Sequence, residues 1–491
     1  MKKRAIVIGA GFSGLATATY LADSGFDVTI LEKNESIGGR ARRFSQEGYT
    51  FDMGPSWYWM PDVFEEYFKA FGKKTTDYYE LIRLDPSYRV VFGEDDYLDI
   101  PAEYSELKQL FDQLEEHSGE KLDIFLEQAA YKYKVGINDL VYKPSRSITE
   151  FLSLKLLIDV MRLDVFVSFE KHIKKFFRHP KILQLLEFPI LFLGALAKNT
   201  PALYSLMNYA DIKLGTWYPR GGMFKVIEGM KELALEKGVK IRVNQEVEAF
   251  EFNSDNTIQA VRTNSDKFMA DVVVASADYH FVEQHILPKH LRNYSDKYWE
   301  TRTMAPSSLI FYLGVNKIIP EIHHHTLYFD EDFGLHSQEI YQNPSWPSKP
   351  LFYLSAPSKT DPDVAPEGHE NLFILIPVAP GLKDSDDIRE KYYDLVMDRL
   401  EKYVKTSVRE HVVYKRSYAH NDFIQDYHAF KGNAYGLANT LRQTAILKPS
   451  LKNKKIDNLY YAGQLTVPGP GVPPSLISGY VVAHEINKDL N

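Results

Sequence analysis

The stretch Gly9-Ala10-Gly11-Phe12-Ser13-Gly14 decides the fold, because it separates a short apolar run from a helical pattern. Ala5 to Gly9 is typical of a buried strand, Ser13 to Ser24 of a helix, and Asp27 to Glu32 of a second strand. Together they predict one βαβ unit whose glycine spacing is that of a dinucleotide-binding loop. The alternative is a structural turn that is merely rich in glycine.

Each residue of this loop has a physical reason to belong to a cofactor site. Gly9 permits the tight turn, Gly11 lets the backbone approach a pyrophosphate, and Gly14 lets the helix pack on its strand. Phe12 and Ser13 stand at the start of the helix, whose positive N-terminal end faces the phosphates. We therefore expect all five residues in the site.

Two signals after the loop specify the dinucleotide. Glu32 ends the second strand, where its carboxylate can accept hydrogen bonds from ribose hydroxyls. Gly38-Gly39-Arg40 adds a second glycine pair and a guanidinium that could neutralise the pyrophosphate or order the ribityl chain of FAD. The alternative is an exposed turn with a solvated arginine. No second G-x-G-x-x-G occurs in the chain, which disfavours a nicotinamide partner.

The composition excludes several classes of protein. The chain has 491 residues and a net charge of -8, with 66 acidic against 58 basic side chains, so nucleic acid is not an expected partner. Cysteine is absent, which excludes disulfides, thiolate metal sites and cysteine nucleophiles. Aromatic residues make up 13% of the chain, more than packing alone would normally require.

The N-terminus imitates a secretory signal, because Lys2-Lys3-Arg4 precedes an apolar run. The loop glycines interrupt that run and the helical pattern continues through Leu21, so the βαβ interpretation is favoured. The longest apolar stretch elsewhere, Phe188 to Ala197, is shorter than the roughly 20 residues of a membrane-spanning helix. A transmembrane protein is therefore not expected.

The order of patterns predicts two domains. Helical patterns dominate from Tyr58 to about Thr216, most clearly from Tyr104 to Val135, and a last helix is expected from about Ser475 to Lys488. Strand patterns occur at Val239–Val243, Glu246–Phe252, Thr257–Thr263, Asp271–Ala275, Ser307–Val315, within Leu351–Val378 and at Leu459–Ala462. We expect an α/β fold, α+β in part. A Rossmann-type FAD-binding domain is assembled from both chain ends (1–75, 217–290 and 440–491), and a substrate domain of antiparallel sheet and helices (76–216 and 291–439) is inserted.

Further motifs extend over essentially the whole chain. They are Gly38-Gly39-Arg40-Ala41, Phe51-Asp52-Met53-Gly54-Pro55, Gly215 to Met223, Ser276-Ala277-Asp278, Asp361-Pro362 with Ala365 to Gly368, and Asn458 to Gly463. With the glycine loop, they make the chain resemble the FAD-dependent carotenoid desaturases of the bacterial phytoene-desaturase type, within the amine-oxidase-like flavoprotein superfamily. The resemblance implies FAD, a long polyene substrate and residence at a membrane surface.

The resemblance also implies site residues. Beyond the loop, the cofactor site is expected to contain Glu32, Lys33, Gly39, Arg40, Gly54, Pro55, Ser56, Val247, Asp278, Gly463, Val472 and Pro473. A dry substrate tunnel would draw on Trp57, Tyr58, Trp59, Trp217, Leu465 and Val467, although each aromatic alone is more typical of a core than of a tunnel. Asp422-Phe423 and Tyr427-His428 also resemble family positions, with an ordinary loop as the alternative. No metal is expected, because His323-His324-His325 would alternate faces on a strand.

The loop after Gly463 departs from the family pattern. Such enzymes carry small residues and a Thr-His-Pro-Gly-Ala-Gly run there, whereas this chain reads Gln464-Leu465-Thr466-Val467-Pro468-Gly469-Pro470-Gly471-Val472-Pro473-Pro474. The bulkier Leu465 and Val467 and the added prolines would reshape the substrate site beside the flavin. This favours a 1-hydroxycarotenoid 3,4-desaturase over a phytoene-type desaturase, with neutral variation of a loop as the alternative.

Residues 150–200, and in particular Leu154 to Ala197, are the expected helical membrane-contact part. One helical face carries the basic residues Lys171, Lys174, Lys175 and Arg178, and the opposite face carries Phe169, Ile173, Phe176 and Phe177. Such a helix can lie in a bilayer interface with its aromatic rings buried in lipid and its cations near anionic headgroups. The alternative packs the phenylalanines inward. We expect a cytoplasmic, peripherally membrane-associated protein.

The expected reaction removes two hydrogens from a single bond next to a conjugated chain. Flavin N5 takes a hydride and a proton leaves to water or a weak base, so no paired carboxylates or Ser-His pair are required. Oxygen or a membrane quinone would reoxidise the flavin. The rivals are an amine oxidase, protoporphyrinogen oxidase or retinol-saturase-like enzyme, which the Trp217 to Met223 motif disfavours, and a flavin-free prenyl-binding chaperone of the GDP-dissociation-inhibitor type, which Glu32 and Arg40 disfavour.

Overall fold

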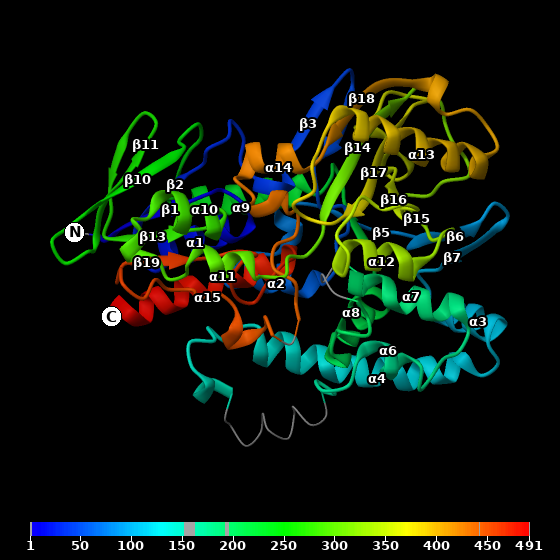
Figure 1. The fold of residues 1–491 in the computed structure, drawn as a ribbon, viewed down its shortest axis with the longest axis horizontal. Helices are drawn as coiled ribbons and strands as arrows, with labels where there is room; N and C mark the ends of the chain where they lie inside the picture. Colours follow the sequence, from blue (N-terminus) through cyan, green and yellow to red (C-terminus); the bar gives the residue numbers. More distant parts are fainter. Residues whose placement is uncertain (1, 152–162, 192–195, 441, 491) are drawn as a thin grey trace.

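A five-stranded parallel sheet forms the part of the molecule at the left of Figure 1. The computed structural model describes residues 2–151, 163–191, 196–440 and 442–490. In spatial order the strands of this sheet are β19 (Leu459–Tyr461), β13 (Val272–Ala275), β1 (Arg4–Ile8), β2 (Asp27–Leu31) and β9 (Lys240–Arg242), and every neighbouring pair is parallel. The first and last strands of the chain therefore lie in one sheet.

Helices from both ends of the chain pack on this sheet. α1 (Phe12–Asp23) follows β1 directly, and α15 (Val472–Leu490) packs against α1. Their contact is close, because a Cβ at Gly479 would lie 2.6 Å from the Cβ of Ala16. α9 (Phe224–Glu236) also contacts α1.

Three smaller antiparallel units accompany the parallel sheet. β10 (Val247–Phe252), β11 (Ile258–Thr263) and β12 (Lys267–Met269) form a meander at the edge of the molecule (Figure 1). The other two are pairs: β3 (Arg43–Gln46) with β4 (Tyr49–Asp52), and β5 (Leu81–Arg83) with β8 (Trp217–Pro219).

A seven-stranded sheet forms the upper right of Figure 1. Its order is β18 (Val412–Tyr418), β14 (Ser307–Val315), β17 (Glu370–Val378), β16 (Phe352–Ser355), β15 (His325–Tyr328), β6 (Tyr88–Gly93) and β7 (Asp96–Ile100). Only the pair of β15 with β6 is parallel among its described pairings. α13 (Asp386–Val404) packs Val396, Met397 and Leu400 against this sheet, in a hydrophobic core that the helix and the sheet form together.

The remaining helices fill the lower right and the centre of the molecule (Figure 1). They are α2 (Pro61–Lys69), α3 (Tyr104–Leu114), α4 (Ser118–Val135), α6 (Phe169–Ile173), α7 (Pro180–Leu191), α8 (Leu206–Tyr209), α10 (Tyr279–Phe281), α11 (Asp296–Glu300), α12 (Phe333–Tyr341) and α14 (His420–Tyr427). Among the described residues, no helix combines the length and the hydropathy that crossing a bilayer requires.

The predicted α/β class and the strands of the parallel sheet are confirmed. The helical expectation for Tyr58 to Thr216 was wrong at β5, β6 and β7. β6 pairs with β15, a strand far away in the sequence, and no local pattern reports such a partner. Tyr104 to Val135 is two helices, because the chain turns at His117, whose backbone φ is +59°.

Candidate functional site

The glycine loop joins β1 to α1. Gly9 has a backbone φ of +99°, and a Cβ at Gly14 would lie 2.0 Å from the Gly9 carbonyl oxygen, so neither position tolerates a side chain. α1 begins at Phe12 without a side-chain cap from Gly11. The first N–H groups of the helix therefore remain available to an anion at its N-terminal end.

Glu32 is held beside the loop at the end of β2. Its carboxylate accepts hydrogen bonds from the backbone N–H groups of Ala10, at 2.8 Å, and of Asn34, at 2.9 Å. The side chain is buried. A carboxylate has further lone pairs, so Glu32 can also accept hydrogen bonds from hydroxyl groups of a ligand.

Arg40 follows two glycines with left-handed backbone conformations. The φ angles are +111° at Gly38 and +55° at Gly39. A Cβ at Gly39 would lie 3.3 Å from the Cα of Gly11, and a Cβ at Gly54 would lie 2.4 Å from the carbonyl oxygen of Arg40. Glycine at these positions thus brings three segments of the chain together beside the N-terminus of α1.

The guanidinium of Arg40 has unused hydrogen-bonding capacity. Its Nη2 donates to the carbonyl oxygen of Asn433 at 3.3 Å, and its carbon lies 5.1 Å from the centroid of the Tyr427 ring. Its Nε is buried and has no hydrogen-bond partner among the described residues. Burial lowers the pKa of Arg40, and nearby Asp278 opposes this shift. A buried cation with an unused donor fits an anionic group such as a pyrophosphate.

A cavity of about 400 Å³ joins these segments. The predicted cofactor residues that line it are Gly9, Gly11, Phe12, Ser13, Glu32, Lys33, Gly39, Arg40, Gly54, Pro55, Ser56, Val247, Asp278, Gly463, Val472 and Pro473. Gly14 is not among the lining residues, because it faces the carbonyl group of Gly9. The remaining residues, predicted from separate motifs, are thus brought to one place.

The chemistry of this cavity fits a flavin dinucleotide. The N-terminus of α1 and Arg40 are suited to the pyrophosphate, and Glu32 is suited to a ribose. Beyond Glu32, the rings of Phe281 and His428 stack with centroids 3.8 Å apart, and His428 shares a 2.7 Å hydrogen bond with Glu246. All three residues line the cavity, and they offer a flat surface to a planar base.

Asp278 has a structural role beside the cavity. Its carboxylate accepts hydrogen bonds from the backbone N–H groups of Phe281, at 3.0 Å, and of Phe430, at 3.2 Å. It thereby caps α10 and ties it to the chain after α14. Burial raises the pKa of Asp278 to about 6.

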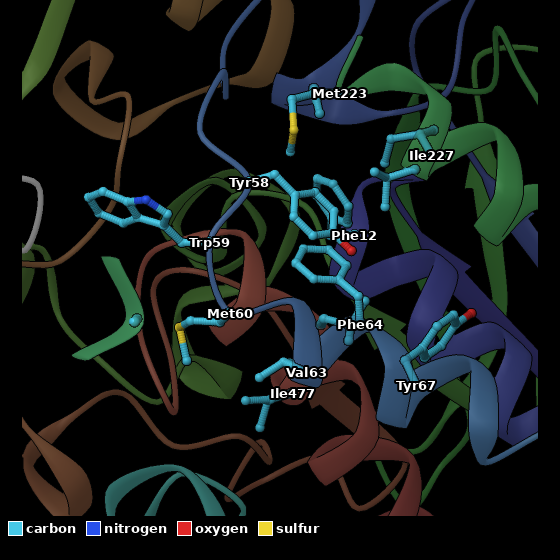
Figure 2. Close-up of a cluster of buried hydrophobic side chains, with 14 of the residues drawn as sticks. Phe12, Tyr58, Trp59, Met60, Val63, Phe64, Tyr67, Met223, Ile227 and Ile477 are labelled. Carbon is cyan, nitrogen blue, oxygen red and sulfur yellow. The ribbon is translucent and has the colours of Figure 1, made fainter. Parts of the chain in front are cut away.

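The predicted tunnel residues divide into two groups. Trp57, Trp59 and Leu465 line the cavity. Tyr58, Trp217 and Val467 are not among the residues that line it. Figure 2 shows Tyr58 within a packed cluster, where its ring stacks on that of Phe64 at 4.4 Å and its hydroxyl is 2.9 Å from that of Tyr79.

The other two residues outside the lining, Trp217 and Val467, are also held in packing. The indole Nε1 of Trp217 donates to the carbonyl oxygen of Leu214 at 2.8 Å, and the guanidinium of Arg83 lies over its ring. Val467 is buried in the main hydrophobic core. Successive side chains of an extended segment point in opposite directions, so Trp57 and Trp59 face the cavity while Tyr58 between them faces away.

A second, apolar cavity adjoins the first. Tyr353, Leu375 and Tyr435 line both, and the second is otherwise lined by residues that include Phe188, Leu327, Phe329 and Ile340. The sequence analysis missed Ile310, Tyr353, Leu375 and Tyr435. Every residue of β14 and β16 is buried, so alternation of polar and apolar residues, the usual signal for the facing side of a strand, is lacking there.

The structure also places the Asp422 to His428 segment and the histidine run that the sequence singled out. Phe423, Tyr427 and His428 line the first cavity, whereas Asp422 accepts a hydrogen bond from the backbone N–H of Ala419 at the start of α14. His324 and His325 are buried at β15. Within the described parts of the chain, no three His, Cys, Asp or Glu side chains are grouped as metal ligands.

The predicted membrane-contact segment lies partly outside the described residues, at 152–162 and 192–195. The expectation that its aromatic face points outward was wrong, because Phe169, Ile173 and Phe177 are buried in the core. The basic residues Lys171, Lys174, Lys175 and Arg178 are exposed as expected. Phe166, which was not singled out, is 89% exposed.

Comparison with known proteins agrees with this geometry. The model of the family described as flavin containing amine oxidoreductase matches residues 12–487. The chain is 41% identical over 485 residues to a carotenoid 3,4-desaturase of Haloarcula japonica, covering 99% of this chain and 98% of the relative. It is 30% identical over 495 residues to a 4,4'-diapophytoene desaturase (4,4'-diaponeurosporene-forming) of Staphylococcus aureus, with the same coverage.

A solved structure shares the fold. A putative protoporphyrinogen oxidase from Exiguobacterium sp. superposes with a TM-score of 0.62 at 16% identity, covering 99% of each chain. The predicted superfamily, the FAD-type flavin cofactor and the oxidoreductase class are confirmed by the family match. From its glycine loop to its last helix, the chain therefore belongs to the flavin containing amine oxidoreductase family.

Proposed function

We propose that the protein is an FAD-dependent carotenoid desaturase that forms the 3,4 double bond of a 1-hydroxylated carotenoid. The identity of 41% to a carotenoid 3,4-desaturase, over nearly the full length of both chains, carries this proposal. The apolar lining of the second cavity and the apolar side chains of the first, such as Ile310, Leu375 and Leu465, support it, because a polyene offers mainly hydrocarbon surface. A phytoene-type desaturase is the second candidate, supported by the 30% identity to a diapophytoene desaturase.

The protein's own residues would bind the cofactor, orient the substrate and exclude water. The N-terminus of α1, Arg40 and Glu32 hold the dinucleotide, and Trp57, Trp59 and Leu465 form apolar walls near it. A bound flavin supplies the acceptor for a hydride. The second hydrogen leaves the substrate as a proton, so one single bond becomes a double bond. Oxygen or a membrane quinone reoxidises the cofactor in this proposal.

The sheet topology supports a division of the chain into a cofactor-binding part and a substrate part. Residues 1–75, 217–290 and 440–491 contain all five strands of the parallel sheet and form the cofactor-binding part. Residues 76–216 and 291–439 contain the seven-stranded sheet and form the substrate part. The first cavity lies where residues of both parts meet, for example Trp57 and Tyr353, and the second cavity is lined by residues of the substrate part.

Two measurements test the function. The purified protein is expected to show a flavin absorption band, whereas a flavin-free prenyl-binding chaperone would be colourless and stay inactive after FAD is added. Expression in cells that accumulate phytoene, lycopene or 1-hydroxylated carotenoids is expected to shift the absorption of the 1-hydroxylated carotenoid to the red. A shift only with phytoene would select the second candidate, and no shift with any of the three would refute desaturation.

We also propose that residues 163–191 contact the surface of an anionic membrane. The exposed Phe166 and the exposed basic residues of α6 and the following turn support this contact. Phe166→Glu is expected to reduce co-sedimentation with vesicles that contain anionic lipid. Val413→Glu is the matched control, since Val413 is 48% exposed on β18, which lies on the opposite side of the molecule from α6 (Figure 1). Equal loss in both variants would contradict the proposal.

A further inference from the structure

Three polar side chains meet where the two cavities join. The hydroxyl of Tyr353 lies 2.6 Å from Nδ1 of His325 and donates a hydrogen bond to Oγ of Ser56 at 2.9 Å. Ser56 and Tyr353 line the first cavity, and Tyr353 also lines the second. We call Ser56, His325 and Tyr353 the Tyr353 cluster.

The Tyr353 cluster is uncharged. His325 is fully buried, and burial lowers its pKa well below the usual range, so the imidazole is neutral at physiological pH. Burial raises the pKa of Tyr353, so its hydroxyl keeps its proton. Two hydroxyls and a neutral imidazole can exchange donor and acceptor roles, and the cluster can therefore present either a donor or an acceptor to the cavity.

A fourth polar atom belongs to the same surroundings. The Trp57 indole stacks on the His325 imidazole, with centroids 4.1 Å apart and planes inclined by 14°. Its Nε1 is buried and finds no hydrogen-bond partner in the part of the chain that the structure describes. Trp57 lines the first cavity, so a ligand there can accept the unused hydrogen bond.

Tyr353 lies among apolar and aromatic side chains, since it pairs with Leu375 of β17 and its ring packs against those of Trp57 and Phe373, so the polarity of the cluster is informative. Ile310, Leu375, Leu465 and Pro470 line the same cavity. A pure hydrocarbon would gain nothing from hydroxyl and indole donors, because polar groups in an apolar pocket serve to orient a polar group of the ligand. A neutral cluster that can both donate and accept matches a neutral hydroxyl, whereas a carboxylate or an ammonium group would lack a countercharge there.

We propose that the Tyr353 cluster, with Nε1 of Trp57, is the subsite that binds the hydroxyl group of the substrate. This inference rests on the proposed function, in which the hydroxyl is on C1 and the reacting bond joins C3 to C4. Because the two are separated by a single carbon atom, a subsite on the wall of the cofactor cavity places the reacting bond in that cavity. Tyr353 is thus a specificity-determining residue.

The experiment compares binding of two carotenoids of equal length, one with and one without the 1-hydroxyl group. The FAD-loaded protein in detergent is titrated with each, and the dissociation constant is read from quenching of tryptophan fluorescence. The wild type is expected to bind the hydroxylated carotenoid about 10-fold more tightly, and Tyr353→Phe to remove most of that preference, as loss of one hydrogen bond predicts. The ratio of kcat/KM for the two substrates is expected to fall in the same way.

A matched control exists in the chain. Tyr49→Phe removes another tyrosine hydroxyl, 2.6 Å from Nδ1 of His369, from a partly buried pair that lines neither cavity. This variant is expected to keep the wild-type preference. Equal affinity of the wild type for both carotenoids, or equal weakening of both by Tyr353→Phe, would overturn the inference. A preference that Tyr353→Phe removes, in a protein that desaturates neither carotenoid, would support the subsite and refute the proposed function.

Discussion

The carbonyl oxygen of Gly9 lies 2.0 Å from the position that a Cβ of Gly14 would occupy. Gly9 directly follows β1, and Gly14 stands in the first turn of α1. The atom in the way is part of the backbone, so a side chain at position 14 could be accommodated only by shifting the helix away from Gly9. The N-terminal end of α1 is thereby held against the cofactor cavity.

Gly14→Ala is accordingly expected to disrupt the cofactor site. The added methyl group must displace α1 from β1, and overpacking of this kind costs about 1 to 3 kcal/mol of folding free energy. We expect a lower midpoint of thermal unfolding and loss of the flavin band from the purified protein. Gly93→Ala is the control, because its Cβ would meet only the Cβ of Asp96, at 3.7 Å, an ordinary contact. Normal flavin content in Gly14→Ala would contradict this account of the loop.

A second prediction concerns the unused donor of Arg40. Arg40→Gln removes the buried positive charge beside the N-terminus of α1, and we expect the affinity for FAD to fall at least about 10-fold. Titration of the apoprotein with FAD, followed by flavin fluorescence, measures the change. Arg262→Gln removes the same charge from an exposed residue of β11 that does not line the cavity, and it should leave the affinity unaltered. An unchanged dissociation constant for Arg40→Gln would exclude a contact with the pyrophosphate.

The glycine positions were predictable because their demands are local. A positive φ at Gly9 or Gly39 and a close approach at Gly14 leave only one residue type at each place, so the spacing reports the geometry. The strand after α1 follows for the same reason, since the helix must return the chain to the sheet beside β1.

The wall of the substrate cavity could not be predicted in the same way. Tyr58 lies between two cavity residues and yet packs against Phe64, and the sequence does not record which way each ring turns. Tyr353 reaches the cavity because β16 lies between β15 and β17, and this placement in the seven-stranded sheet is a tertiary property that the four residues of the strand do not carry. Its partner His325 was considered only as part of a histidine run, because the hydrogen bond between them exists only in the folded sheet.

A third prediction follows from a buried amine. Lys448 lies beside the loop at Gly469, its Nζ is buried, and it has no hydrogen-bond partner among the described residues. Burial lowers its pKa from 10.5 to about 7. The folded state therefore binds fewer protons than the unfolded state between about pH 7 and 10.5, and stability rises with pH in this window.

Lys448→Met removes the free-energy cost of burying the charged amine while keeping an unbranched side chain of similar length. We expect the variant to be several kcal/mol more stable than the wild type at pH 7, with the difference shrinking as the pH rises toward 10. Chemical denaturation at both pH values measures it. A difference in stability that does not change with pH would show that the amine is not destabilised by burial.

A fourth prediction concerns the buried carboxyl group of Asp211. Its titration should make the free energy of unfolding depend on pH. Tyr88 and Thr216 donate hydrogen bonds to its two oxygens, at 2.8 and 3.2 Å, yet burial raises its pKa from 3.8 to about 6. The folded state therefore binds more protons than the unfolded state between about pH 4 and 6. Its contribution to stability is most favourable below this window and is lost as the pH rises through about 6, where the charged form costs about 2 to 3 kcal/mol.

Asp211→Asn keeps the shape of the side chain and cannot ionise. The unfolding free energy of the variant minus that of the wild type should therefore increase from pH 4 to pH 6 by about 2 to 3 kcal/mol and stay level above pH 7. Any pH-independent cost of rearranging the hydrogen bonds to Tyr88 and Thr216 shifts the whole curve without changing its slope. Asp255→Asn is the control, since this exposed residue has a lowered pKa and should give no increase over the same window. A level difference curve for Asp211→Asn would mean that Tyr88 and Thr216 fully compensate the buried charge.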